Sequence, residues 1–269
     1  MYRLYYYNAL SLIARYQNDQ IGLIETCKKA IAFFSKRTTP LPYTTKFTFQ
    51  FQLIPIYLKQ KKYADAHVII KSCLVLPSSG SYSWHLTTLY KAVLGFYSGK
   101  PIIALNAYLE AQKALKKIKS NTIDSRWQII EAYLYLFAKA DLLKLEGKFR
   151  LYKFLNTVKP NQKGKHQVFV LHLLYLIFDG KKKEFMKECD NIEGYIHRHK
   201  SIPSRARYFL RLLHCVEKGD YNKLRVQAHA KKNLALLRSN ARHLDIEVFD
   251  NEPVPFERLW GMVVDGLGK

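Results

Sequence analysis

The sequence has little cysteine, glycine or proline, and these shortages exclude several fold classes. Its 269 residues include 4 Cys, 12 Gly and 9 Pro. No two cysteines form a CxxC pair, so neither a disulfide framework nor a zinc knuckle is expected. So few turn-forming residues do not suit a many-stranded fold, whereas the Leu, Ala and Lys content favours long helices. We therefore expect an all-α protein with buried, reduced cysteines, which are Cys27, Cys73, Cys189 and Cys215.

Long apolar segments are also absent. The longest run, residues 168–178, is about eleven residues long, whereas a helix needs about 20 to span a bilayer. The residues after Met1 lack the apolar region and the small-residue cleavage site of a secretory signal. We therefore expect no transmembrane helix and a cytoplasmic location.

Motifs that carry known chemistry are missing as well. The sequence contains no dinucleotide-binding glycine pattern, no P-loop, no HExxH and no GxSxG. The nine histidines are dispersed, and His197 and His199 lie two positions apart, so on a helix they point apart and make a poor metal pair. We therefore predict a non-catalytic protein with no catalytic residue, no cofactor and no metal.

Acidic residues are scarce relative to basic ones. The chain carries 44 Lys and Arg against 21 Asp and Glu, a formal charge of +23. Residues 241–269 reverse the balance, with 3 basic and 6 acidic residues. The potential around residues 1–240 would attract nucleic acid, an anionic membrane or an acidic protein, unless it only solvates an outer face. The candidate basic surface consists of Lys113, Lys116, Lys117, Lys181, Lys182, Lys183, Arg205, Arg207, Arg211, Arg225 and Lys232.

A repeat runs along residues 1–240. Helical, aromatic-rich stretches end in short turns, and a second helical stretch follows each turn at once. Four of these turns contain glycine, which suits the left-handed position that closes a helix. Successive turns lie about 33 to 48 residues apart, a spacing typical of helical repeats. The six predicted turns are 17–20, 59–63, 97–101, 145–149, 178–181 and 218–221.

Apolar periodicity within these stretches predicts six helical hairpins. For example, Ala66, Ile69, Ile70 and Cys73 recur at helical spacing and form one apolar stripe. The predicted helices are 2–16, 20–36, 45–59, 63–76, 82–98, 101–118, 122–145, 148–157, 164–178, 181–199, 203–218 and 220–237.

Two of these hairpins resemble units of the tetratricopeptide family. The first contains Leu53-Ile54-Pro55-Ile56-Tyr57, Tyr63-Ala64-Asp65-Ala66, Ile70, Cys73 and Leu76-Pro77, and the second contains Trp84, Leu89, Tyr90, Ala92, Gly95, Ala104, Tyr108 and Ala111. The later hairpins are degenerate, and most of the spacings between turns exceed the 34 residues of that family. The resemblance implies a right-handed superhelix over residues 1–240, whose concave groove is lined by the first helix of each pair and binds a protein or peptide.

Aromatic residues are concentrated on the predicted first helices. Most are expected to fill the core, because a first helix packs against two neighbours. Tyr5, Tyr6 and Tyr7 are consecutive and cannot share one helix face, so some hydroxyls should reach the groove, where tyrosine is a favoured anchor. The candidate groove residues are Tyr6, Tyr57, Tyr90, Tyr97, Tyr133, Tyr135 and Tyr175.

The tail, residues 241–269, is acidic, interrupted by proline and ends in one amphipathic helix. The apolar residues of that helix are Phe256, Leu259, Trp260, Val263, Val264 and Leu267. It either caps the end of the repeat domain or docks its acidic and aromatic side chains, in cis on the basic body or in trans on a neighbour.

These observations favour a non-catalytic scaffold or regulatory module that binds a protein or peptide through an aromatic-lined groove. The alternative is a nucleic-acid-binding repeat that uses the basic surface, and a third is an accessory subunit of an enzyme. Because the first predicted repeat helix has no capping segment before it, an upstream domain or partner is also expected. The oligomeric state and the partner's identity have no sequence signal.

Overall fold

The computed structural model describes residues 2–36, 43–75, 77–115, 121–147, 149–158, 165–240 and 251–267. Within these ranges the chain is all-helical, with no β-strand. The helices are α1 (Tyr2–Tyr16), α2 (Gln20–Ser35), α3 (Tyr43–Lys59), α4 (Tyr63–Leu74), α5 (Tyr82–Tyr97), α6 (Pro101–Leu115), α7 (Asn121–Lys139), α8 (Leu151–Thr157), α9 (Lys165–Phe178), α10 (Lys182–Cys189), α11 (Ile192–Arg198), α12 (Ser204–Lys218), α13 (Lys223–Ser239) and α15 (Phe256–Gly266).

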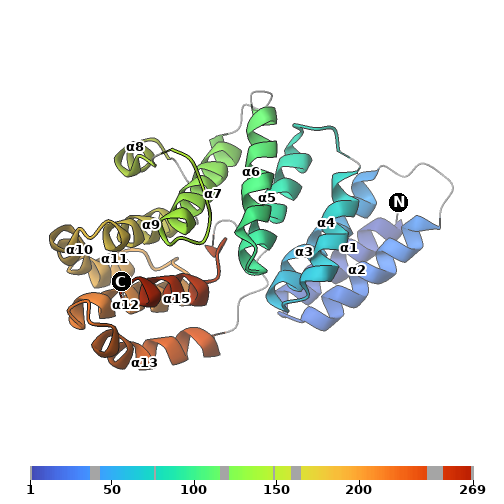
Figure 1. Cartoon of the computed structure of the whole chain (residues 1–269). Coiled ribbons are helices and arrows are strands. Elements are labelled where there is room, and N and C mark those ends of the chain that lie inside the picture. The colour runs from blue at the N-terminus through green and yellow to red at the C-terminus, as the bar shows by residue number, and fades with distance from the viewer. Residues whose placement is uncertain are drawn as a thin grey trace.

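Consecutive helices pack as antiparallel hairpins in a repeat-like succession. The pairs α1/α2, α3/α4, α5/α6 and α12/α13 are in close contact, and each of the first three hairpins packs on the next through α2 with α3, α4 with α5, and α6 with α7. Figure 1 shows α1 to α4 on one side of the molecule, α5 and α6 in the middle, and the later helices on the other side. The predicted all-α class is therefore confirmed.

One turn geometry recurs in every hairpin. A residue in the left-handed backbone region follows the first helix, and these residues recur at intervals of about 40, in the range of long helical repeats. The residue after each of them donates its backbone N–H to the carbonyl five positions earlier, at 2.8–3.1 Å, which is the Schellman arrangement. The six left-handed residues are Asn18, Lys61, Gly99, Asp141, Gly180 and Asp220.

The fourth turn lies earlier than predicted. The sequence placed it at residues 145–149, with Gly147 closing a helix that ran to residue 145, but α7 ends at Lys139 and Asp141 takes the left-handed position. Aspartate tolerates this conformation because its short polar side chain can bond locally. Gly147 also has a positive φ, of 94°, within the irregular connection that leads to α8.

The predicted helix 181–199 is two helices, α10 and α11. The break falls at Asp190 and Asn191, residue types that compete with the helix for backbone hydrogen bonds. The side-chain amide of Asn191 donates to the carbonyl of Lys187 at 3.2 Å, and Asp190 closes α10. The other predicted helices are confirmed to within a few residues in the described ranges.

The core runs through all six hairpins and is rich in rings. Trp127, Tyr90 and Tyr133 are among its largest fully buried side chains. All four cysteines are buried and free, as predicted. None of the helices in the described part of the chain combines the length and the apolar character that crossing a membrane requires.

The turn geometry predicts opposite effects for glycine at two exposed lysines. Lys61 has φ of 59°, whereas Lys71 lies inside α4. Lys61→Gly should raise the free energy of unfolding by about 0.5 kcal/mol, because it removes left-handed strain. Lys71→Gly should lower it by about 1 kcal/mol. Urea titration of both variants checks the prediction, and a loss of stability in Lys61→Gly would contradict it.

Candidate functional site

The C-terminal segment, residues 251–267, lies across the inner face of the hairpins. We define the inner face as the surface of α5, α7, α9 and α12, the first helices of the last four hairpins. Helix α15 packs on α9, α12 and α13. In Figure 1 it runs beside α12, while the residues before it reach toward the foot of α5 and α6.

A buried arginine binds this segment to α12. Arg205 is only 6% exposed. Its Nε donates to Glu252 Oε2 at 2.8 Å, and its Nη2 donates to Glu252 Oε1 at 3.0 Å and to Glu257 Oε1 at 2.8 Å. Its Nη1 donates to the carbonyls of Leu237 and Asn240 at the end of α13. All five N–H bonds of the guanidinium are therefore satisfied.

The charge on Arg205 is stabilised in place. Burial alone would lower the pKa of Arg205, but hydrogen bonds and charges from Glu252 and Glu257 outweigh burial and raise that pKa. A buried charge is tolerated only when it is paired and hydrogen-bonded in this way. Arg205, Glu252 and Glu257, which we call the arginine clasp, therefore hold three elements together: α12, the end of α13 and the start of α15.

Further polar contacts carry the segment to α5. The hydroxyl of Tyr97 donates to the carbonyl of Glu252 at 2.9 Å, and the Glu252 carboxylate accepts from the backbone N–H of Phe256 at 2.9 Å. Arg258 donates to the carbonyl of Phe96 at 3.0 Å and lies over the ring of Phe137 at 5.0 Å. The segment is thus anchored on the third and fourth hairpins as well as on the last one.

The α9 contact uses buried polar groups. Gln167 donates to the carbonyl of Asn251 and accepts from the hydroxyl of Tyr133. The Nε2 of His166 lies 3.0 Å from the same Asn251 carbonyl. These hydrogen bonds satisfy side chains that would otherwise be costly to bury.

Apolar side chains also pack the C-terminal segment against the helices. Phe256, Leu259 and Val263 are fully buried, and the ring of Phe256 stacks on that of Phe209 with centroids 4.6 Å apart. The described contacts dock the segment in cis on the other helices. Helix α15 also covers α12 and α13, so it closes the inner face and the last hairpin together.

Five of the seven candidate groove tyrosines lie in the core: Tyr57, Tyr90, Tyr97, Tyr133 and Tyr175. Burial is the main cause that raises the pKa of Tyr57, Tyr133 and Tyr175. In the folded chain these five rings offer little surface to a partner, because neighbouring helices and, over Tyr97, the C-terminal segment cover them. Tyr135 is partly exposed and donates to the carbonyl of Glu146, and Tyr6 is 52% exposed on α1.

The described candidate basic residues lie in different surroundings. Arg205 belongs to the interior, Arg211 pairs with Glu193, Arg207 donates to backbone carbonyls, and Lys181 pairs with Glu184. Those that are exposed lie on three separate helices: Lys113 on α6, Lys182 and Lys183 on α10, and Arg225 and Lys232 on α13. Lys116 and Lys117 lie outside the described residues.

The clasp was not predicted from the sequence, although the position of Arg205 pointed to it. Arg205 occupies the same stripe as Phe209, Leu212 and Val216, at helical spacing. A charged residue on an apolar stripe predicts a buried partner. No comparable sequence pattern identifies Glu252 as a buried partner, because the residues that it contacts are distant in sequence.

Burial is the main cause that raises the pKa of Cys27, Cys73 and Cys189 to about 12, which keeps these thiols protonated at neutral pH. No group of three His, Cys, Asp or Glu side chains in the described ranges could hold a metal ion.

Comparisons of the chain with family models, with curated proteins and with solved structures find no match.

The clasp predicts a graded loss of stability. Arg205→Met removes the cation that compensates the buried carboxylate of Glu252 and should lower the free energy of unfolding by about 3–5 kcal/mol. Glu257→Gln, which weakens only the outer partner, should lower it by about 1.5 kcal/mol. Arg211→Met breaks an exposed pair and should cost less than about 1 kcal/mol. Chemical denaturation tests the series, and equal losses for Arg205→Met and Arg211→Met would contradict the buried role.

Proposed function

We propose that the chain is a non-catalytic protein-interaction module, a tetratricopeptide-like helical repeat whose docking surface is the outer face of α1. The regular hairpins and the recurring turn support the repeat, with the right-handed superhelical path that the resemblance implies. The cytoplasmic location expected from the sequence is part of this proposal. The observation that carries it is the exposure of α1.

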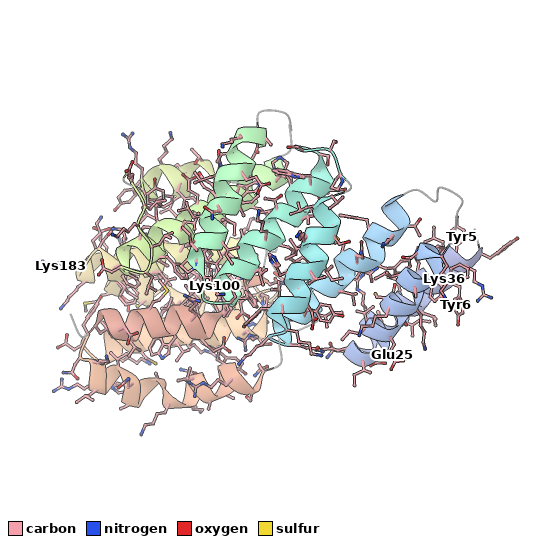
Figure 2. The ribbon with its side chains drawn as sticks, turned by 45° about the vertical axis from the view of Figure 1, so that its right-hand side comes forward. Tyr5, Tyr6, Glu25, Lys36, Lys100 and Lys183 are labelled. Carbon is pink, nitrogen blue, oxygen red and sulfur yellow. The ribbon has the colours of Figure 1, made fainter. Side chains whose placement is uncertain are left out.

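Helix α1 exposes a stripe of large apolar side chains. We call this stripe the α1 face, and its members are between 51% and 97% exposed. Large contiguous apolar exposure marks interaction sites, and a helix of a repeat protein that faces water is normally polar there. Figure 2 shows Tyr5 and Tyr6 at the end of the molecule opposite Lys183. The residues of the α1 face are Tyr2, Tyr5, Leu12, Ile13 and Tyr16.

The inner face supplies less surface than the resemblance implied. The arginine clasp and α15 cover it from α5 to α12, and the rings beneath are buried. A partner that docked there would have to displace residues that are part of the core. The α1 face needs no such rearrangement.

The positive charge around α1 favours a partner with acidic residues. Arg3 and Arg15 flank the α1 face, and the exposed Lys28 follows on α2, where Lys29 pairs with Glu25. A second copy of a chain with a charge of +23 would bring like charges together. We therefore commit to an amphipathic helix of a partner protein, with an apolar stripe flanked by Asp or Glu. Such a helix buries its apolar side on α1 much as α3 packs on α2.

The proposal predicts a selective loss of binding. A synthetic amphipathic helix with a Leu stripe flanked by Glu should bind the purified chain, as measured by fluorescence anisotropy. Ile13→Asp should weaken this binding at least about tenfold, because it places a carboxylate among buried apolar groups and near the peptide's own acids. Leu224→Asp is the control, because Leu224 is 78% exposed on α13.

Two outcomes would overturn the proposal. One is equal binding by the Ile13→Asp and Leu224→Asp variants. The other is displacement of the peptide by mixed-sequence oligonucleotides at about 200 mM salt, which would favour the nucleic-acid alternative.

A further inference from the structure

Buried rings connect the third hairpin to the fourth. Helix α7 packs on both α5 and α6, and Figure 1 shows the three helices beside one another. The rings of His85 on α5 and Trp127 on α7 have centroids 6.4 Å apart, and Tyr108 of α6 lies 6.2 Å from the Trp127 ring. His85 and Trp127 are 0% and 1% exposed. We call these three residues the ring cluster.

One hydrogen bond determines where the proton of His85 lies. Trp127 Nε1 donates to His85 Nδ1 at 3.3 Å. An indole nitrogen can only donate, so Nδ1 must be unprotonated and the neutral imidazole carries its proton on Nε2. His85 Nε2 is buried and has no hydrogen-bond partner among the described residues. The ring therefore has one nitrogen that must stay unprotonated and another whose N–H has no acceptor.

A second proton on His85 is unfavourable for two reasons. It would go to Nδ1, where it would face the indole N–H and remove the hydrogen bond to Trp127. It would also place a positive charge on a fully buried ring, which is costly unless the charge is paired. Burial lowers the pKa of His85, and it outweighs Asp124 of α7, the charged group that acts on the ring among the described residues.

Acid therefore favours any state in which the ring cluster is open. In such a state, as in the unfolded chain, His85 meets water and takes up a proton near the ordinary histidine pKa of about 6.5. A group whose pKa is lower in the folded state than in the unfolded state makes folding less favourable as the pH falls below the unfolded value. Stability is thus complete above about pH 7.5 and is lost progressively below about pH 6.5.

We propose that the ring cluster is an acid-sensitive contact between the third and fourth hairpins, which weakens under mildly acidic conditions. Histidine is the side chain whose ordinary titration falls in this range. The ring cluster shares no residue with the α1 face, so this inference does not depend on the proposed docking surface.

The test compares the full chain with two variants by urea titration at about pH 7.5 and about pH 5.5. His85→Asn removes the titrating group, and the side-chain oxygen of asparagine can accept from the indole in place of Nδ1. His229→Asn is the matched control, because His229 is exposed on α13. The remaining histidines are common to all three proteins, so contributions such as that of His172 cancel in the comparison.

Between these two pH values, we expect the folding equilibrium constant of the wild type to fall at least about threefold more than that of His85→Asn. The His229→Asn variant should follow the wild type, because an exposed imidazole is solvated in the folded and unfolded states alike. Equal losses in the wild type and His85→Asn would overturn the proposal, as would a loss in His229→Asn as small as that in His85→Asn.

An NMR titration of the wild type makes the test independent of whether His85→Asn folds. The His85 ring is assigned by its nuclear Overhauser effect to the indole N–H of Trp127. We expect its resonances to remain those of a neutral imidazole protonated at Nε2 down to about pH 5.5 for as long as the chain is folded. A His85 ring that takes up a proton near pH 6.5 while its contact with Trp127 persists would overturn the proposal.

Discussion

The buried guanidinium of Arg205 is the constraint on which the rest of the molecule depends. A charge at this depth is tolerated only because five donors meet five acceptors, and three of those acceptors come from Glu252 and Glu257. Undocking the C-terminal segment would therefore take the Glu252 and Glu257 carboxylates away from a charge that α12 holds buried. The same requirement sets the position of α15 and brings Arg258 against α5.

The clasp makes the two ends of the molecule unlike each other. Around α12 and α13, the segment seals the inner face and buries rings such as Tyr97 that a repeat protein could otherwise present in a groove. At α1, the large side chains of Tyr5 and Ile13 meet water. The large apolar side chains that α1 presents to water therefore have no counterpart on the part of the inner face that the segment covers.

Local features of the fold could be predicted from the sequence, and long-range ones could not. Helical periodicity and turn glycines placed most helices and five of the six turns, because both signals act over a few residues. The fourth turn was predicted at Gly147, but Asp141 adopts the left-handed conformation that ends α7. Tyr97 was expected in the groove and Arg205 on the surface, yet both are buried by Glu252, 155 and 47 positions away in sequence. No local pattern encodes such a pairing.

Native-state hydrogen exchange tests most directly whether the C-terminal segment is part of the core, which is the central claim. Amides exchange at the rate of global unfolding only where no smaller opening exposes them. We expect the amides of Leu259 to Val263 in α15 to exchange as slowly as those of Phe209 to Leu213 in α12. Much faster exchange of α15, while α12 stays protected, would show a segment that detaches on its own and would contradict the claim.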